Sequence, residues 1–305
     1  MITLRTTSPA KLNLGLEITG RRADGYHNLI SVFQSITLAD DLEFTAPVPR
    51  TMLLVQHQEG GGTDITSDNL ITRAIDLFSA RFAPPLATRV TLTKRIPVAS
   101  GFGGASSNAA ATLRAVRALS ESELSRSVMM ALARELGSDI PFFLTAGTAL
   151  VSGTGDQIDP LPSPGDGWFV LMSPRLGVPI ERKTATLYQA LTERDFSSGG
   201  LVRAQAENLV AGRRLDPSLL TNPFQRHMLE LRPELALLLD AFTAAGAPFV
   251  ALSGAGPGHY TYVEHHEAAE RIASRARSRI GGHADIFVAT VCPYLAPLEK
   301  IASVA

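Results

Sequence analysis

The sequence predicts a mixed fold of α-helices and β-strands, and three observations support this. Apolar residues alternate through much of the first 45 residues, which is typical of strands. Between residues 69 and 136 they recur at helical spacing, and the last part of the chain shows both patterns in turn. Hydrophobic residues make up 45% of the 305 residues and charged residues 19%, so the chain can build sizeable cores. Its length is compatible with one large domain or two of moderate size.

Strands are expected first along the chain. Apolar residues at period two predict a half-buried strand that contains Leu12, Leu14, Leu16 and Ile18. The polar segment 21–25 contains Asp-Gly, which predicts a turn. A second pair of strands is expected over residues 32–44, and Gly60 to Gly62 predict a loop.

Helices are expected in the next part of the chain. Ser67, Asp68 and Asn69 can cap a helix that runs to about residue 82. A short strand over 90–94 leads into a glycine-rich segment over 100–108, and a helix follows it. A further helix over 123–136 should end at Gly137.

The best candidate for a domain boundary is the segment 156–167, which is rich in Pro, Gly and Asp. It suggests two domains, 1–160 and 161–305. In the second part, strands are expected over 168–172, 248–252, 259–263 and 286–291, and helices over 185–191, 233–245 and 267–280. A second glycine-rich turn covers residues 253–258.

Composition excludes several classes of function. The net charge of −1 and the absence of a long basic run argue against nucleic-acid binding, which needs a concentrated positive face. Cys292 is the single cysteine, so no intrachain disulfide is possible, and we expect it to be a core residue. No signal-peptide pattern and no apolar run of about 18 residues is present. We therefore expect a soluble, cytoplasmic protein without a membrane partner.

The segment 100–108 is a candidate anion site. A glycine-rich turn that opens a helix presents free backbone N–H groups and the positive end of the helix dipole. Ser106 and Ser107 add hydroxyl donors, so a triphosphate suits this turn. The alternative is a turn that only connects a strand to a helix. The segment has neither the Gly-Lys-Ser/Thr of a Walker A loop nor the context of a dinucleotide-binding fingerprint.

Three motifs in order resemble the GHMP kinase family. The stretch Pro97 to Asn108 is similar to the family's phosphate loop, Ser8 to Leu14 to its N-terminal motif, and Ser253 to Gly258 to its C-terminal motif. The resemblance covers nearly the whole chain. It implies a two-domain α+β fold, with ATP and a second substrate in the cleft between the domains.

The resemblance also implies which residues bind ATP, with Mg²⁺ as its companion. Besides Asn69 and Lys94, the nucleotide contacts would come from Pro97, Val98, Ala99, Ser100, Gly101, Phe102, Gly103, Gly104, Ala105, Ser106 and Ser107. Asn69 is equally well explained as a helix cap. Ala105 and Phe102 stand where many relatives have glycine and leucine, and no protein ligand of a metal is identified.

The segment Leu136 to Phe142 matches a family segment whose aspartate is the proposed catalytic base. This assigns Asp139 as the base and Lys11 as the cation that faces it. A nearby ammonium group would keep the carboxylate ionised and help to orient the acceptor hydroxyl. The alternatives are that Asp139 caps a helix at Pro141 and that Lys11 is solvated. Asn13 shares a strand face with Lys11, so we assign it to substrate positioning.

Tyr26 and His27 close the segment Gly20 to His27, which is similar to a signature of one branch of the family. An aromatic ring beside an imidazole can stack on a base and hydrogen-bond to its edge, although a plain turn would also explain the pair. In that branch the pair binds the cytosine of a cytidylylated methylerythritol, which is phosphorylated on its 2-hydroxyl for non-mevalonate isoprenoid synthesis. Asn108 is assigned to the same substrate, and Tyr188 is a candidate second aromatic ring.

Two alternatives stay open at this stage. The chain could be another kinase of the family, acting on mevalonate, homoserine or a sugar, but those acceptors carry no pyrimidine for Tyr26 and His27 to bind. It could also be a non-catalytic nucleotide-binding protein, although Lys11 and Asp139 are both present. The C-terminal motif, Gly-Ala-Gly-Pro-Gly, lacks two hydroxyl groups that are common in the family, and Asn222 to Gln225 also departs from the usual pattern.

Overall fold

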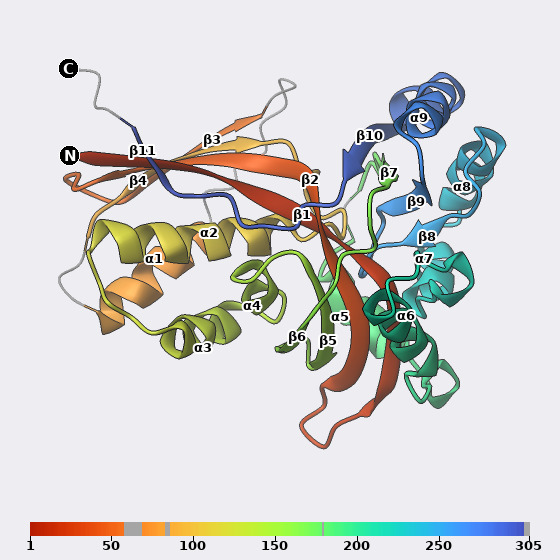
Figure 1. Ribbon diagram of the computed structural model, residues 1–305, viewed down its shortest axis with the longest axis horizontal. Coiled ribbons are helices and arrows are strands. Elements are labelled where there is room, and N and C mark those ends of the chain that lie inside the picture. Colours follow the sequence, from red (N-terminus) through yellow and green to blue (C-terminus); the bar gives the residue numbers. More distant parts are fainter. Residues whose placement is uncertain (58–68, 83–85, 179, 302–305) are drawn as a thin grey trace.

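The computed structural model describes residues 1–57, 69–82, 86–178 and 180–301. The loop expected at Gly60 to Gly62 and the cap residues Ser67 and Asp68 lie outside these ranges. Within them, a seven-stranded sheet and a four-stranded sheet form two neighbouring parts of the molecule (Figure 1). The mixed helix and strand prediction is therefore confirmed. No helix within these ranges has the length and apolar character that a membrane crossing requires.

Two long antiparallel strands organise the first sheet. β1 (Ile2–Arg21) pairs with β2 (His27–Ala46), which is one continuous strand where the sequence predicted a pair. The turn expected between residues 21 and 25 joins them, and the Gly25 N–H donates to the carbonyl oxygen of Arg22 at 3.1 Å. The order of the sheet is β11 (Glu299–Ile301), β1, β2, β4 (Arg89–Lys94) and β3 (Met52–His57). β5 (Thr148–Gly153) pairs with β2, and β6 (Gln157–Leu161) pairs with β5.

β1 is buried on both faces, where the sequence predicted a half-buried strand, because an apolar cluster lies on each side of it. The register with β2 shifts between Asn13 and Leu16, so the side chains beyond the shift change face. Leu12 and Leu14 pack in the apolar cluster next to the second sheet, whereas Leu16 belongs to the cluster on the helical side. Simple alternation cannot predict this change.

Four helices cover one face of the first sheet (Figure 1): α1 (Leu70–Arg81), α2 (Gly104–Leu119), α3 (Arg126–Leu136) and α4 (Ile140–Phe143). The Asn69 side chain caps α1 by accepting a hydrogen bond from the Ile71 N–H at 2.9 Å. α2 begins at Gly104, earlier than the apolar spacing indicated, because its first turn is the glycine loop itself. α3 ends at Gly137, as predicted.

The second sheet is antiparallel, in the order β10 (Ala284–Thr290), β7 (Trp168–Pro174), β9 (His259–Val263) and β8 (Ala251–Leu252). α8 (Leu235–Ala244) and α9 (His266–Ile280) pack on it around Val170 and Phe242. α5 (Lys183–Ala190) was expected, whereas α6 (Gly200–Val210), α7 (Phe224–Leu231) and strands β3, β5, β6 and β11 were not. The short, polar or interrupted apolar patterns of these segments give little periodic signal.

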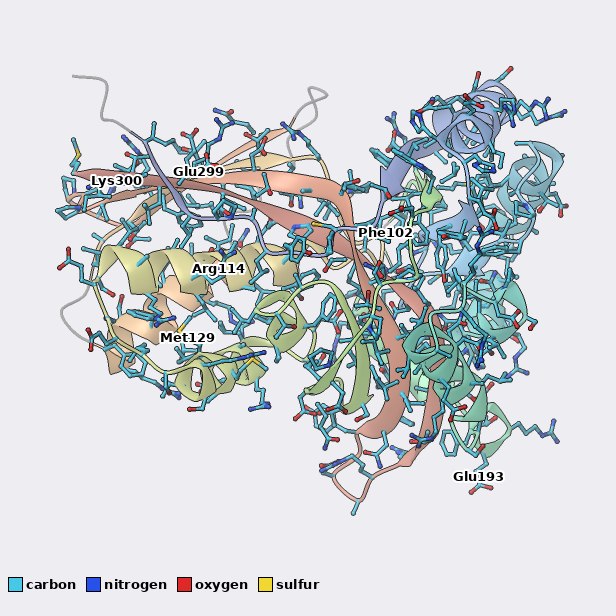
Figure 2. All side chains as sticks on the ribbon, in the orientation of Figure 1. Phe102, Arg114, Met129, Glu193, Glu299 and Lys300 are labelled. Carbon is cyan, nitrogen blue, oxygen red and sulfur yellow. The ribbon has the colours of Figure 1, made fainter. Side chains whose placement is uncertain are left out.

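The two sheets meet at β1. The Tyr260 hydroxyl, fully buried in β9, donates to the backbone carbonyl of Asn13 at 2.7 Å. Phe102, also fully buried, packs in the same cluster and lies between the two parts of the molecule in Figure 2.

Cys292 is partly exposed, so its assignment as a core residue was wrong; its backbone N–H donates to the carbonyl oxygen of Ser35 at 2.8 Å.

Candidate active site

The N-terminal motif, the phosphate loop and the C-terminal motif come together at the junction of the sheets, although they lie far apart in the sequence. The Lys11 N–H donates to the Phe102 carbonyl at 2.9 Å, and the Gly258 N–H donates to the Ser100 carbonyl at 2.7 Å. Gly101 has a φ of +91°, and a Cβ there would collide with the Ser253 carbonyl oxygen. Only glycine allows the two loops to approach so closely.

The phosphate-loop cavity, of about 190 Å³, lies at the N-terminus of α2. It is lined by Asn69, Leu92, Lys94, Pro97, Val98, Ala99, Ser100, Gly101, Gly103, Gly104, Ala105, Ser106 and Asn108. The first N–H groups of α2 have no partner within the helix, so this cavity can bind an anion. Ala105 is helical, not in the left-handed region, so alanine in place of glycine causes no strain there.

Two predicted nucleotide contacts lie elsewhere. The Phe102 side chain points into the apolar cluster and does not line the phosphate-loop cavity. Ser107 is buried in the first turn of α2 and does not line the cavity either; its hydroxyl has no hydrogen-bond partner among the described residues. Phe102 therefore positions the loop through packing.

Lys94 and Asn108 are held by a buried carboxylate. The Lys94 ammonium pairs with Asp40, whose side chain is fully buried. Asn108 donates to the same carboxylate at 3.0 Å and accepts from the Ser8 hydroxyl at 2.5 Å. The structure thus places Asn108 in the wall of the phosphate-loop cavity, not beside Tyr26 and His27, with its side-chain amide already bonded.

Lys11 and Asp139 face each other, as the sequence predicted. The Lys11 Nζ lies 3.4 Å from the Asp139 Oδ2; 4% of the lysine side chain and 32% of the aspartate side chain are exposed. The ammonium also donates to Asn13 Oδ1 at 2.6 Å and lies 4.4 Å from the centre of the Phe33 ring. Asp139 precedes α4, but its side chain makes no capping hydrogen bond. Its carboxylate is therefore available to a substrate.

The reaction cavity, of about 630 Å³, connects the other sites. Lys11, Asn13 and Asp139 line it. It shares Ala99, Gly101, Gly103 and Ser106 with the phosphate-loop cavity. At its other end it shares Gly137, Ser138, Thr184, Ala185 and Tyr188 with a third cavity. The Lys11–Asp139 pair therefore lies between two binding sites of one continuous cleft.

The third cavity, of about 790 Å³, is the aromatic cavity, lined by Tyr26, His27 and Tyr188 among others. The rings of His27 and Tyr188 lie 5.4 Å apart at 32°, whereas 68% of Tyr26 is exposed. Burial, assisted by the charge of Arg21, lowers the pKa of His27, which favours the neutral imidazole. A planar base can stack here and hydrogen-bond to that imidazole.

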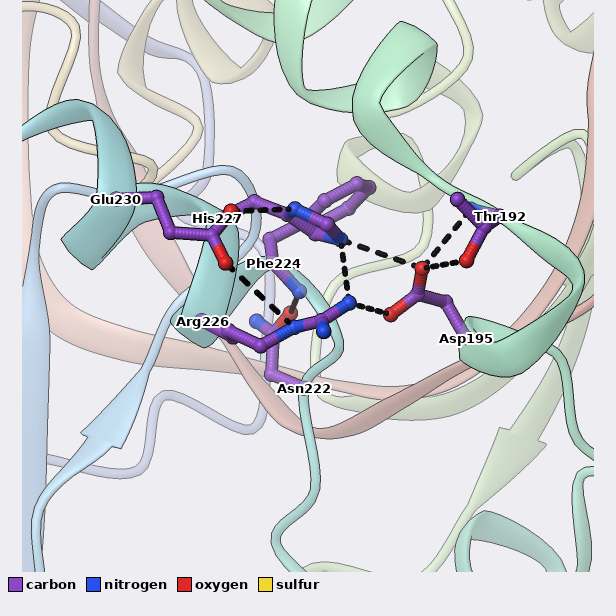
Figure 3. A network of polar contacts seen from close by, with 7 residues as sticks. All are labelled: Thr192, Asp195, Asn222, Phe224, Arg226, His227 and Glu230. Atoms are coloured by element: carbon purple, nitrogen blue, oxygen red, sulfur yellow. Dashed lines mark hydrogen bonds and ion pairs between the residues drawn. The ribbon is translucent and has the colours of Figure 1, made fainter.

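A polar network joins the segment around Asp195 to Arg226 and His227 of α7 (Figure 3). Asp195, in the 3₁₀ turn Glu193–Asp195, accepts from Arg226 at 2.8 Å and lies 3.3 Å from the buried His227 of α7. The next residue, Phe196, packs edge-on against His27 at 5.9 Å. The network therefore lies next to Phe196, which packs against the His27 ring of the aromatic cavity.

Asn222, shown in the same view, supports the C-terminal motif (Figure 3). Its side-chain nitrogen donates to the carbonyl oxygens of Leu252 and Gly254 at 3.1 and 2.9 Å, and its Oδ1 accepts from the Phe224 N–H at 3.0 Å. Phe224 in turn packs edge-on against Tyr188 at 4.9 Å. The altered segment 222–225 therefore still shapes the cleft.

Comparisons with known proteins identify the family of this chain. Residues 69–147 match the model described as the GHMP kinases N terminal domain. A 4-diphosphocytidyl-2-C-methyl-D-erythritol kinase from Dehalococcoides mccartyi is 37% identical over 96% of this chain and 99% of its own length. A crystal structure of 4-(cytidine 5'-diphospho)-2C-methyl-D-erythritol kinase is 34% identical and superposes with a TM-score of 0.75, covering 94% of this chain and 98% of the other. A homoserine kinase from Cytophaga hutchinsonii, at 16% identity and a TM-score of 0.71, covers 98% of this chain and 97% of its own; it shows the fold alone.

Proposed function

This chain belongs to the 4-diphosphocytidyl-2-C-methyl-D-erythritol kinases within the GHMP kinase family, and we propose that it carries out the reaction of that family. It transfers the γ-phosphoryl group of ATP to the 2-hydroxyl of 4-diphosphocytidyl-2-C-methyl-D-erythritol, in the non-mevalonate route to isoprenoids. We also propose that the reaction takes place in the cytoplasm.

One observation carries the proposal: a single cleft joins an anion site to an aromatic cavity, with a cation and a carboxylate between them. ATP occupies the phosphate-loop end. The cytosine occupies the aromatic cavity beside His27 and Tyr188, so the erythritol portion reaches back into the reaction cavity. Mevalonate and homoserine have no ring to occupy the aromatic cavity.

The side chains at the centre support a direct transfer. Asp139 accepts the proton of the 2-hydroxyl as that oxygen bonds to the γ-phosphorus and the bond to the β-phosphate oxygen breaks, which releases ADP. Lys11 lies beside Asp139 and stabilises charge on the transferring group. Asn13 orients the Lys11 ammonium, and its own amide nitrogen donates to the Ser31 hydroxyl at 2.9 Å.

The site suits Mg²⁺ carried by ATP. Among the described residues, no three His, Cys, Asp or Glu side chains gather to hold a metal. An oxygen donor is present, however, because Ser106 borders both the phosphate-loop cavity and the reaction cavity. Mg²⁺ prefers oxygen ligands and keeps several waters, so phosphate oxygens and one serine suffice. When bound, the ion neutralises phosphate charge.

The proposal is tested by measuring ADP release with ATP and each of three acceptors: 4-diphosphocytidyl-2-C-methyl-D-erythritol, mevalonate and homoserine. We expect turnover with the first acceptor only, and a product phosphorylated on the 2-hydroxyl by ³¹P NMR. Turnover of mevalonate or homoserine, without turnover of the cytidylylated acceptor, would overturn the proposal.

A further inference from the structure

Lys183 is a cation of the reaction cavity that none of the three motifs contains. It is the first residue of α5, and its side chain reaches across the cleft to both glycine loops. The ammonium donates to the carbonyl oxygen of Ala99 at 2.5 Å and to that of Gly256. Ala99 lies in the phosphate loop and Gly256 in the C-terminal motif, so Lys183 bridges the two parts of the molecule.

Among the described residues, no carboxylate forms an ion pair with the Lys183 ammonium. None of the ion pairs found in the described ranges includes Lys183, whereas Lys11 and Lys94 each face a carboxylate. Its two partners are neutral carbonyl groups. A partly buried cation without an anion is costly, and a phosphate group would supply the missing charge.

The position of Lys183 in the cleft indicates which phosphate it would meet. Lys183 lines the reaction cavity, together with Lys11 and Asp139, but not the phosphate-loop cavity at the N-terminus of α2. The α2 end therefore receives the inner phosphates, and Lys183 lies on the acceptor side of them, where the terminal phosphate is transferred.

From this geometry we propose that Lys183 is a second cation of the transfer reaction, which leaves the two carbonyl groups and binds the γ-phosphate of ATP. The inference rests on the proposed kinase function. Lys183 then acts together with Lys11, which lines the same cavity. Because α5 also carries Tyr188 of the aromatic cavity, this helix links the nucleotide to the acceptor.

Lys183→Met tests the proposal, since methionine keeps the length of the side chain and removes its charge. A charge-assisted hydrogen bond to phosphate is lost, so we expect the affinity for a non-hydrolysable ATP analogue to fall on the order of 10- to 100-fold. ADP has no γ-phosphate, so its affinity should change by less than about twofold. Lys183→Arg, which keeps the charge, should recover most of the binding. Lys300→Met is the matched control, because Lys300 is exposed on β11 at the far end of the first sheet (Figure 2).

A purely structural bridge between the loops would give a different result. In Lys183→Met, the affinities for the ATP analogue and for ADP would then fall by the same factor, and Lys183→Arg would also affect both ligands equally. This outcome would overturn the proposal. An unchanged affinity of Lys183→Met for the ATP analogue would overturn it as well. If Lys183→Met does not fold, Lys183→Gln and Lys183→Arg are compared in the same way. The wild-type enzyme separates failure of this proposal from failure of the proposed kinase function. If the kinase function is wrong, the wild type releases no ADP with the cytidylylated acceptor.

The pH dependence gives a second readout. Burial lowers the pKa of Lys183 to about 8, so the cation is present below that pH and is lost above it. Lys11, Asp139 and Arg182 are the other charged groups that line the cavity. We expect ATP-analogue affinity to fall above about pH 8 in the wild type, and this fall to disappear in Lys183→Arg, because arginine stays protonated. An identical fall in both proteins would contradict the proposal.

Discussion

Replacing Asp139 with asparagine separates the chemical role of the carboxylate from its role in stability. At 3.4 Å from Lys11, the charge pair is worth about 5 kcal/mol at an effective dielectric constant of about 20. Water reaches a third of the Asp139 side chain and screens most of this attraction. Lys11 keeps its hydrogen bond to Asn13 and its contact with the Phe33 ring. We therefore expect the free energy of unfolding to fall by only about 1 kcal/mol, which lowers Tm by about 1–2 °C in a chain of 305 residues.

The expected effect on catalysis is much larger. Asparagine cannot accept the proton of the acceptor hydroxyl, so kcat should fall about 10²- to 10⁴-fold, equivalent to about 3–5 kcal/mol. The affinity for ATP should change little, because the phosphate-loop cavity does not include Asp139. ADP release under saturating substrates and a thermal melt measure the two quantities separately.

Asp216→Asn is the matched control. The Asp216 carboxylate caps the turn Pro217–Leu219, accepting from the Ser218 N–H at 2.9 Å, and lines none of the three cavities of the cleft. We expect this variant to keep its kcat and to lose only a little thermal stability. A folded Asp139→Asn variant with a wild-type kcat would refute the assignment of Asp139 as the base.

Three further predictions concern the aromatic cavity, a buried histidine and the glycine loop. His27→Ala should raise KM for the cytidylylated acceptor about 10-fold or more and leave KM for ATP unchanged, since one wall of the base site is lost; equal changes in both constants would contradict this. Burial lowers the pKa of His259 to about 4, below its unfolded value of about 6.5, so its contribution to stability is complete above about pH 6.5 and is lost as the pH falls toward 4. The free energy of unfolding, measured with urea, should therefore fall by about 2 kcal/mol between pH 7 and pH 5 in the wild type, and this fall should be absent in His259→Gln. The same fall in the variant would exclude His259 as the cause. Gly101→Ala should lower Tm and raise KM for ATP, because the new Cβ would collide with the Ser253 carbonyl oxygen. Gly212→Ala is the control, since Gly212 has a φ of +67° but a Cβ there would have no neighbour within 4 Å, and it should leave KM for ATP unchanged. Equal effects of both variants would show that backbone strain, and not the collision, is the cause.

The chemistry of the cleft was largely predictable from local sequence. A helix cap, a glycine turn and a strand face each depend on residues a few positions apart, so the cap at Asn69, the glycine-rich turn over 100–108 and the shared face of Lys11 and Asn13 could be identified directly. The pairing of Lys11 with Asp139 came from the resemblance to the family, because no local pattern relates two residues so far apart. The same is true of Tyr26 and His27.

Packing between distant segments decided the rest. The register shift in β1 places Leu16 in a different apolar cluster from Leu12 and Leu14, and Asn108 bonds to Asp40 in the wall of the phosphate-loop cavity. Lys183 has no motif around it and became a candidate only when folding brought α5 over both glycine loops. The sequence by itself determined which groups were available for phosphoryl transfer. Tertiary structure determined which of them line the cleft and which are already paired with another side chain. Burial and pairing depend on contacts between residues that are far apart in the sequence, so local patterns do not predict them.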